Sequence, residues 1–143
     1  MGRIFKQKIY IVMSSYYSQL KNFSCNFSKI PANIIVGAAK EIGESLTNEQ
    51  LKSSQLRKFY DSVKQLELKL IDKKDSDELD DKIIAQLVFL KPHLENASKK
   101  SKIPKDFKDI IEYSIDKVTK QGNTKEDFKY FVKFFESIVA YHK

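Results

Sequence analysis

The sequence has no tryptophan and, in 143 residues, only one cysteine, three prolines and four glycines. A single thiol, Cys25, excludes a disulfide within the chain and a metal site built from several cysteines. An all-β fold needs many turns, and few glycines and prolines are present to make them. The shortage therefore favours a small number of long helices, and the length fits one domain with its own hydrophobic core.

Long apolar runs are also missing. No stretch approaches the ~20 apolar residues that a membrane-spanning helix needs. The apolar run at residues 9–13 is shorter than the core of a secretory signal, which has ~7–15 residues. With one cysteine and no such segment, the sequence predicts a cytoplasmic protein that has no membrane partner.

The motifs of common enzyme and metal sites are absent from the sequence as well. It contains no GxxxxGK[ST], GxGxxG or GxSxG pattern, and neither His93 nor His142 has the partners of an HExxH site. The acidic run at 72–81 fails as a calcium loop, because Leu79 takes a ligand position and Asp80 the position that needs glycine. We therefore expect no catalytic residues, no metal, no cofactor and no enzymatic activity.

What the chain has in excess is positive charge. It carries 26 basic and 19 acidic side chains, a net charge of +7. Residues 1–40 hold six of the basic side chains and no acid, so the other 103 residues are nearly balanced at 20 against 19. A basic protein attracts polyanions through a field that salt screens. A lysine-rich composition also arises from codon bias alone, so the charge by itself does not decide the function.

Hydrophobic residues at helical spacing predict an all-α fold, a single compact bundle of five to six helices. The prediction divides the chain into a basic, aromatic amino-terminal extension at 1–30, with a helix over about 5–20, and a helical-bundle domain at 31–143. The extension is expected to dock on the domain, although its lack of acids also fits an organellar transit peptide. The domain's predicted helices cover 31–46, 54–70, 76–99, 104–122 and 124 to the carboxyl end.

Polar residues near the helix starts support several of these boundaries. Thr124 and Asp127 have the spacing of a capping box, which predicts the start of the last helix. Thr47 and Gln50 have the same spacing, so the second helix could begin near them. A polar residue at 75 or 76 is expected to cap the third helix.

The third predicted helix contains Pro92. A proline inside a helix removes one backbone hydrogen bond and clashes with the carbonyl four residues earlier, at a cost of about 3 kcal/mol. We therefore expect a kink at this point. The kink would direct Lys91 and His93 to one side and Lys99 and Lys100 to the other.

Basic side chains on the second and third predicted helices form the candidate binding surface. Arginine binds phosphate through bidentate contacts and lysine through point-charge contacts, so this surface would hold an anion. Arg57 stands out because it is one of only two arginines, whereas a single lysine is more often an ordinary solvated side chain. The candidates are Arg57, Lys58, Lys64, Lys91, His93, Lys99, Lys100 and Lys102.

Three segments, in order, resemble a known family. Residues 53–60 read SSQLRKFY and resemble the [ST]-S-Q-[IL]-R-[KN]-F segment of the small helical subunit of type III-A CRISPR effector complexes, the Csm complexes. Residues 90–100 read LKPHLENASKK and are similar to its L-K-P-[RK]-L-x-Y-A-x-G-R stretch. Residues 134–143 read FFESIVAYHK and resemble its ending F-x-E-A-[IL]-V-A-Y-H-K. The resemblance covers about residues 32–143.

The resemblance implies a non-catalytic, RNA-binding small subunit in antiviral defence. Such subunits stack with neighbouring copies of themselves beside the other subunits and line the channel that holds guide RNA and target RNA. The candidate side chains would then contact RNA backbone, which carries no sequence information. Three positions depart from the family's pattern: His93 replaces Arg or Lys, Asn96 replaces Tyr, and Lys99 replaces Gly. Either Lys99 or Lys100 could therefore take the family's basic position.

Three other functions stay open on the sequence alone. The helices could form a protein–protein interaction module whose basic residues meet an acidic partner without RNA. Residues 1–30 could lie on a membrane surface as an amphipathic helix. The third alternative is an enzyme whose site has no recognisable motif.

Overall fold

The computed structural model describes residues 16–143, and this part of the chain folds into seven α-helices and one short 3-10 helix. The only β pairing among these residues is an isolated bridge between Glu78 and Thr124, so the predicted all-α fold is confirmed. None of the described helices is long and apolar enough to cross a membrane. The elements are α2 (Tyr16–Asn22), η1 (Phe27–Lys29), α3 (Ala32–Ser45), α4 (Ser53–Leu68), α5 (Asp81–Val88), α6 (Leu90–Lys99), α7 (Lys105–Thr119) and α8 (Lys125–Tyr141).

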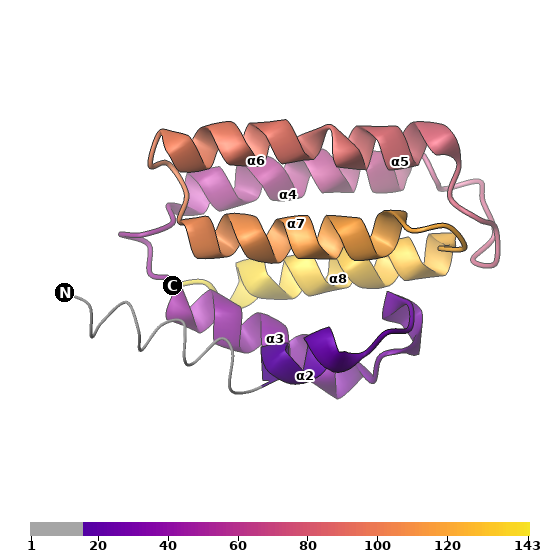
Figure 1. The fold of residues 1–143 in the computed structure, drawn as a ribbon, viewed down its shortest axis with the longest axis horizontal. Helices are drawn as coiled ribbons and strands as arrows, with labels where there is room; N and C mark the ends of the chain where they lie inside the picture. The colour runs from indigo at the N-terminus through magenta and orange to yellow at the C-terminus, as the bar shows by residue number, and fades with distance from the viewer. Residues whose placement is uncertain (1–15) are drawn as a thin grey trace.

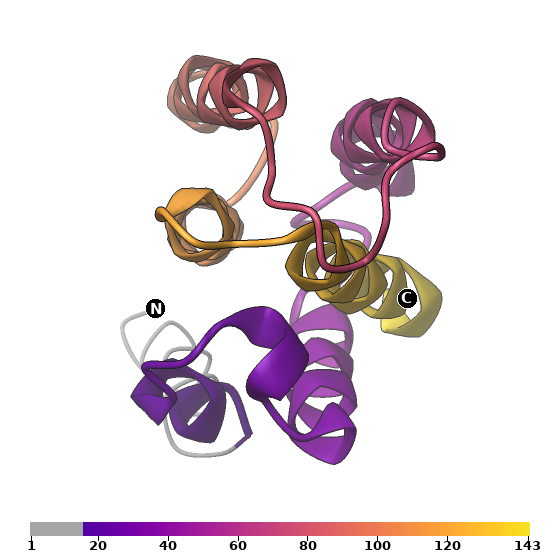
Figure 2. The ribbon, with the colours of Figure 1, turned by 90° about the vertical axis from the view of Figure 1, so that its right-hand side faces the viewer.

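The helices lie in three layers, seen from the side in Figure 1 and end-on in Figure 2. One outer layer holds α4 beside the end-to-end pair α5 and α6, the middle layer holds α7 and α8, and the other outer layer holds α2 and α3. Helix α8 is central, because it packs against α3, α4, α7 and η1.

The core is built around the phenylalanines of α8. Phe128, Phe131, Phe134 and Phe135 recur at spacings of one to three residues along the helix and are completely buried. The ring centroid of Phe27 in η1 lies 6.1 Å from those of Phe131 and Phe134. The burial of each such ring stabilises the fold by about 1.5–3 kcal/mol. Because these rings lie on α8, that helix holds the elements of the three layers together.

The described part of the predicted amino-terminal extension shares this core. Tyr17 and Leu20 of α2 are buried, as are Phe27 of η1 and Ile30, and α2 packs along α3. Residues 16–30 therefore pack on the helical bundle. The predicted helix over 5–20 lies largely outside the described residues, and only its end overlaps α2.

The predicted capping box of the last helix is confirmed, and its Asp127 also binds residues around η1. The Thr124 hydroxyl accepts the Asp127 N–H, and the Asp127 carboxylate accepts the Thr124 N–H at 2.9 Å. The same carboxylate accepts the Ser28 N–H and the Asn26 amide, each at 3.1 Å. Burial alone would raise the pKa of Asp127, but the hydrogen bonds from Ser28 and Thr124 outweigh it and lower the pKa. One carboxylate thus ties the η1 turn to the start of α8.

The predicted cap of the third helix at 75 or 76 is wrong. Helix α5 begins at Asp81, and its cap is Asp80, whose carboxylate accepts the Ile83 N–H at 2.9 Å. The preceding residues run instead along the start of α8, where the Asp77 carbonyl accepts the Lys125 N–H at 2.8 Å. Those backbone bonds satisfy exposed N–H groups of α8, and they keep residues 75–79 out of a helix.

The predicted helix start near Thr47 is also displaced. Gln50 accepts the Thr47 N–H at 3.2 Å, but the residues form a single turn. Helix α4 begins at Ser53, whose N–H donates to the Asn48 side chain at 3.0 Å. Asn48 therefore supplies the oxygen that a capping residue would have provided.

The single kinked helix predicted over 76–99 is two helices in the structure. Helix α5 ends at Val88 and α6 begins at Leu90, so the break falls at Phe89, three residues before Pro92. Pro92 has no N–H to donate to the Val88 carbonyl, and its ring crowds that carbonyl. As the third residue of α6, Pro92 sits in a first turn where no intrahelical donor is required. The two helices still run end to end (Figure 1).

Candidate nucleic-acid interface

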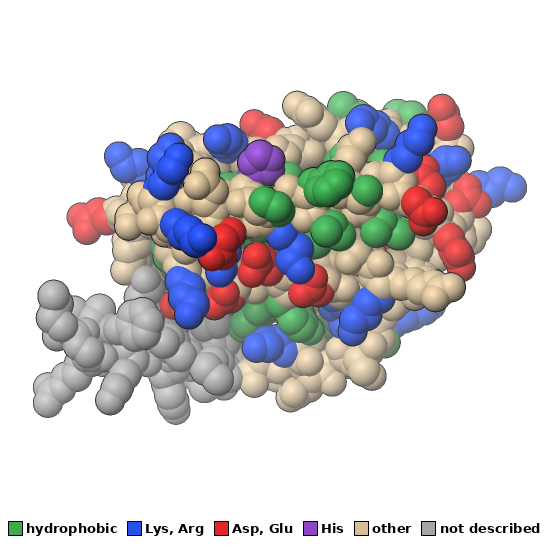
Figure 3. Space-filling view, turned by 45° about the horizontal axis from the view of Figure 1, so that its top comes forward, with side chains coloured by type: hydrophobic (Ala, Val, Ile, Leu, Met, Phe, Trp, Pro, Cys, Tyr) green, Lys and Arg blue, Asp and Glu red, His purple; other side chains and the backbone are tan. Residues whose placement is uncertain are grey.

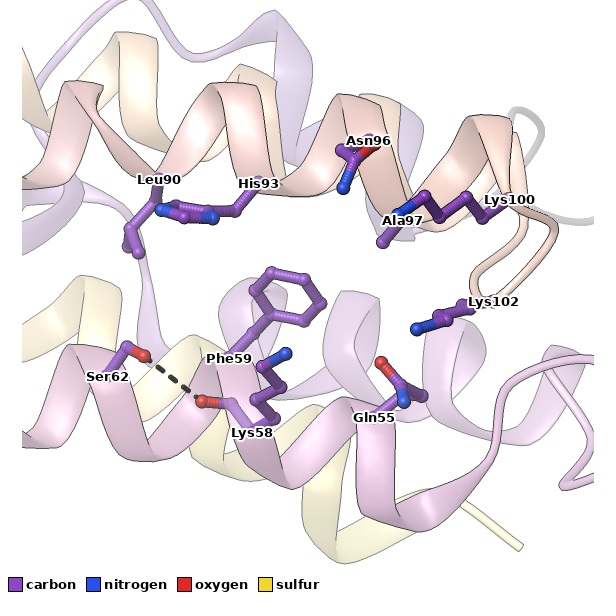
Figure 4. Close-up of a pocket in the computed structure, with 10 residues that line it drawn as sticks. All are labelled: Gln55, Lys58, Phe59, Ser62, Leu90, His93, Asn96, Ala97, Lys100 and Lys102. Atoms are coloured by element: carbon purple, nitrogen blue, oxygen red, sulfur yellow. Dashed lines mark hydrogen bonds between the residues drawn. The ribbon is translucent and has the colours of Figure 1, made fainter.

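Helices α4 and α6 face each other across a cleft of about 220 Å³, which we call the α4–α6 cleft (Figure 4). One wall comes from successive turns of α4 and the other from successive turns of α6 and the turn that follows. Residues three, four or seven apart share a face of a helix, which is why each wall is a regular stripe. The lining residues are Gln55, Lys58, Phe59, Ser62, Leu90, His93, Asn96, Ala97, Lys100 and Lys102.

Four of the predicted basic residues meet in this cleft. Lys58 projects from α4 towards α6, while His93 and Lys100 come from α6 and Lys102 from the turn after it (Figure 4). No acidic side chain lines the cleft among the residues that the structure describes. None of these four side chains forms an ion pair with another described residue. Cations gathered in a recess without acids create a local positive potential that attracts anions.

A tight turn at the end of α6 brings Lys102 back to the cleft. Ser101 has a φ of 58°, in the left-handed region. The Lys102 N–H donates to the Ala97 carbonyl at 2.9 Å, and the Ser101 N–H donates to the Ser98 carbonyl at 3.0 Å. This pair of bonds is a Schellman motif, in which a left-handed residue reverses the chain after a helix. The turn thus places Lys102 opposite Gln55, beside Lys100.

The floor of the cleft is apolar. Phe59 is 5% exposed and Ala97 is 8% exposed, and Leu90 packs against the same core. These side chains hold the two helices at a fixed separation, so the cations above them are presented on a rigid base.

Three uncharged polar residues of the cleft were not predicted. Gln55 and Ser62 flank Lys58 on α4, and Asn96 lies between His93 and Lys100 on α6. Their amides and hydroxyl can donate to or accept from a ligand. Spacings of three and four residues from a basic candidate were the signal that could have found them.

The other predicted residues lie outside the cleft. Arg57 and Lys64 share a face of α4, roughly opposite to the cleft by helical geometry. Lys64 pairs with Glu67 at 2.7 Å, and that hydrogen bond raises the pKa of Lys64. Lys91 instead pairs with Asp116 of α7 at 2.7 Å.

The expected division of basic residues by the proline is wrong. His93 was expected to lie with Lys91 and away from Lys100. In the structure His93 and Lys100, which are seven residues apart, line the same cleft, while Lys91 points to α7 and Lys99 is exposed outside the cleft. The reason is that the break falls at Phe89, so Lys91, His93 and Lys99 belong to one regular helix, and Lys100 caps its carboxyl end.

Comparison with protein families decides the assignment. The family model described as Csm2 Type III-A matches residues 29–143, most of the chain. The chain belongs to the Csm2 family of type III-A CRISPR systems. No curated protein and no solved structure gives a significant match to it. As a Csm2 family member it is a subunit of a type III-A CRISPR effector complex and associates with other subunits of that complex.

Two of the three segments that resemble the small type III-A subunit form the two walls of the cleft. Residues 53–60 make the first half of α4, and residues 90–100 make α6 and its end. The third segment, residues 134–143, ends beside the start of α4. The Lys143 carbonyl accepts the Asn48 N–H at 3.1 Å, and His142 Nδ1 lies 3.5 Å from the Ser53 hydroxyl. The carboxyl end of this Csm2 family member therefore supports the start of α4.

The departure from the family pattern at Lys99 has a structural counterpart. The family stretch carries Gly-Arg where this chain has Lys99-Lys100, and glycine is the residue that suits a left-handed position. In this chain α6 ends at Lys99, and the left-handed residue is Ser101, followed by Lys102. Both Lys100 and Lys102 therefore reach the cleft, and Lys99 does not.

Proposed function

We propose that this chain is a non-catalytic subunit whose α4–α6 cleft holds the backbone of RNA, either the guide RNA or its paired target RNA. The observation that carries the proposal is the meeting of Lys58, His93, Lys100 and Lys102 in one recess that no described acid lines. Lysine ammonium groups and the N–H group of a histidine ring bind phosphate oxygens without reading bases. A subunit that must hold any guide sequence needs contacts of this kind.

The chemistry of the cleft supports a binding role over a catalytic one. Its polar groups are three lysine ammonium groups, one imidazole, two amides and one hydroxyl, so no carboxylate of residues 16–143 lines the cleft to form an acid–base pair with His93. No cluster of three or more His, Cys, Asp or Glu side chains in residues 16–143 could hold a metal ion. A cytoplasmic location and stacking with neighbouring copies remain predictions from the sequence. Arg57, Lys64, Lys91 and Lys99 are secondary candidates for RNA contact.

The proposal is tested by the salt dependence of RNA binding. Each phosphate contact contributes about 0.7 to the slope of log affinity against log salt for a single strand, and about 0.9 for a duplex. Replacing Lys58, Lys100 and Lys102 together by alanine should reduce the slope by roughly two. The loss should be the same for RNAs of unrelated sequence.

A matched control removes the same charge elsewhere. Lys73, Lys120 and Lys133 are exposed lysines that do not line the cleft. Their triple replacement by alanine should change the slope much less. Equal effects of the two triple variants would show that only net charge matters, and a change in sequence preference would contradict a backbone-binding cleft.

A further inference from the structure

Phe89 is unusual among the phenylalanines of residues 16–143. Its side chain is 66% exposed, whereas every other phenylalanine in this part of the chain is buried or half-buried. An aromatic ring left in water gains little of the free energy that burial provides. The stability of the fold therefore gives no reason for an aromatic side chain at this position.

Phe89 is held in a defined position. It joins α5 to α6 with helical backbone angles, φ −68° and ψ −12°, and its N–H donates to the Ala85 carbonyl at 2.9 Å. Because the backbone is helical, Phe89 shares a face with His93, Asn96 and Lys100 at spacings of four, seven and eleven residues. The row extends roughly 16 Å at 1.5 Å per residue. The exposed aromatic thus stands at one end of the α4–α6 cleft.

The surroundings of the ring indicate what could cover it. Figure 3 shows exposed hydrophobic side chains beside a histidine on the face that carries α5 and α6. Val88 is also exposed, at 41%, but it lies about 100° around the helix from Phe89 and further from the cleft. From Phe89 the row leads directly into the cleft's uncompensated cations. A ligand that covers both offers an apolar surface to the ring and negative charge to the basic side chains, and a nucleotide carries these two groups side by side.

We propose that Phe89 stacks on an unpaired base of the RNA strand whose phosphates lie along the α4–α6 cleft. The inference rests on the proposed function and adds a base contact to it. Stacking of bases on aromatic side chains next to a cationic groove is a general way of holding single strands, and it tolerates any sequence because every base has a π face. The contact is therefore compatible with a subunit that does not read sequence.

The test separates the ring from the charges. The full-length chain is titrated with oligouridine of about 12 nucleotides, and with an abasic ribose-phosphate strand of equal length and charge. The wild type should bind oligouridine roughly five- to a hundredfold more tightly than the abasic strand. Phe89→Leu should erase that preference and leave the salt slope unchanged, because it removes no charge. Val88→Ala, the matched control, should behave as the wild type.

Each other outcome overturns the inference in a recognisable way. If the wild type binds both strands equally, or if Phe89→Leu keeps the preference, the stacking contact is wrong and the backbone-binding cleft stands. If Phe89→Leu and Val88→Ala leave RNA binding intact but both release the chain from the assembled complex, the patch is a protein interface. If the wild type shows no salt-dependent binding of either strand, the proposed function and the stacking contact both fail.

Discussion

Replacing the buried Asp127 by asparagine should destabilise the fold more than any other change of a single acid at the helix starts. The side chain is 2% exposed, and one carboxylate accepts hydrogen bonds from Asn26, Ser28 and Thr124. Asparagine keeps the shape but turns an NH₂ group towards N–H donors. A lost hydrogen bond to a charged group is worth about 1.5–3 kcal/mol, and the donor left without a partner adds a similar penalty. We expect Asp127→Asn to lower the free energy of unfolding by roughly 3 kcal/mol.

The loss should depend on pH in a defined direction. The pKa of Asp127 is lowered in the folded state, so the carboxylate contributes stability above its unfolded pKa of about 3.9. That contribution is lost as the pH falls through the lower folded pKa. The stabilities of the wild type and of Asp127→Asn should therefore differ most near pH 7 and converge in acid. Urea unfolding followed by circular dichroism at several pH values measures this difference.

Glu126 provides the matched control, because it is the neighbouring acid in the same helical turn but is exposed. Glu126→Gln removes the same charge near the same helix end, where a surface carboxylate is worth about 0.3–1 kcal/mol. The reasoning would be refuted if Glu126→Gln cost as much as Asp127→Asn. It would also be refuted if the deficit of Asp127→Asn stayed constant from pH 7 to well below the unfolded pKa.

Three further changes test other parts of the structure. Ser101→Gly should raise the urea midpoint, by up to about 1 kcal/mol in stability, because only glycine adopts a positive φ without strain; a lower midpoint would contradict the left-handed turn. Gly43→Ala should cost about 1–3 kcal/mol in thermal unfolding, because its Cβ would lie 2.8 Å from the Ile138 carbonyl oxygen; an unchanged melting temperature would exclude that close approach. Lys91→Ala should reduce the salt slope of RNA binding less than replacement of any cleft lysine by alanine does, because Lys91 pairs with Asp116. An equal reduction would show that Lys91 contacts the RNA as the cleft lysines do.

The fold was predictable from the sequence where apolar residues recur at helical spacing. The stripe of phenylalanines in α8 and the capping box of Thr124 and Asp127 each follow from local rules, and both are confirmed. The sequence predicts a kink at Pro92, but the break lies at Phe89, because Pro92 acts on the carbonyl four residues before it. The helix start at Asp81 was missed for another reason: residues 75–79 bond to the backbone of α8, which is distant in sequence.

The cleft shows what helical spacing can and cannot say about function. His93 and Lys100 are seven residues apart, so a regular helix places them on one face. The α6 wall of the cleft can therefore be predicted from the sequence once the helix is known to be regular. Which face of α4 lies opposite His93 and Lys100 depends on how α4 packs against α6, and helical spacing does not predict that packing. In the structure the packing places Lys58 in the cleft and Arg57 on the far side of α4. Arg57 had the strongest chemical case as a phosphate ligand but lies outside the cleft, whereas Lys102 was one lysine among several candidates and lines it. Charge type alone therefore ranks candidates poorly, because a cation that could bind an anion acts only where the fold gathers it with others and leaves it without an acidic partner.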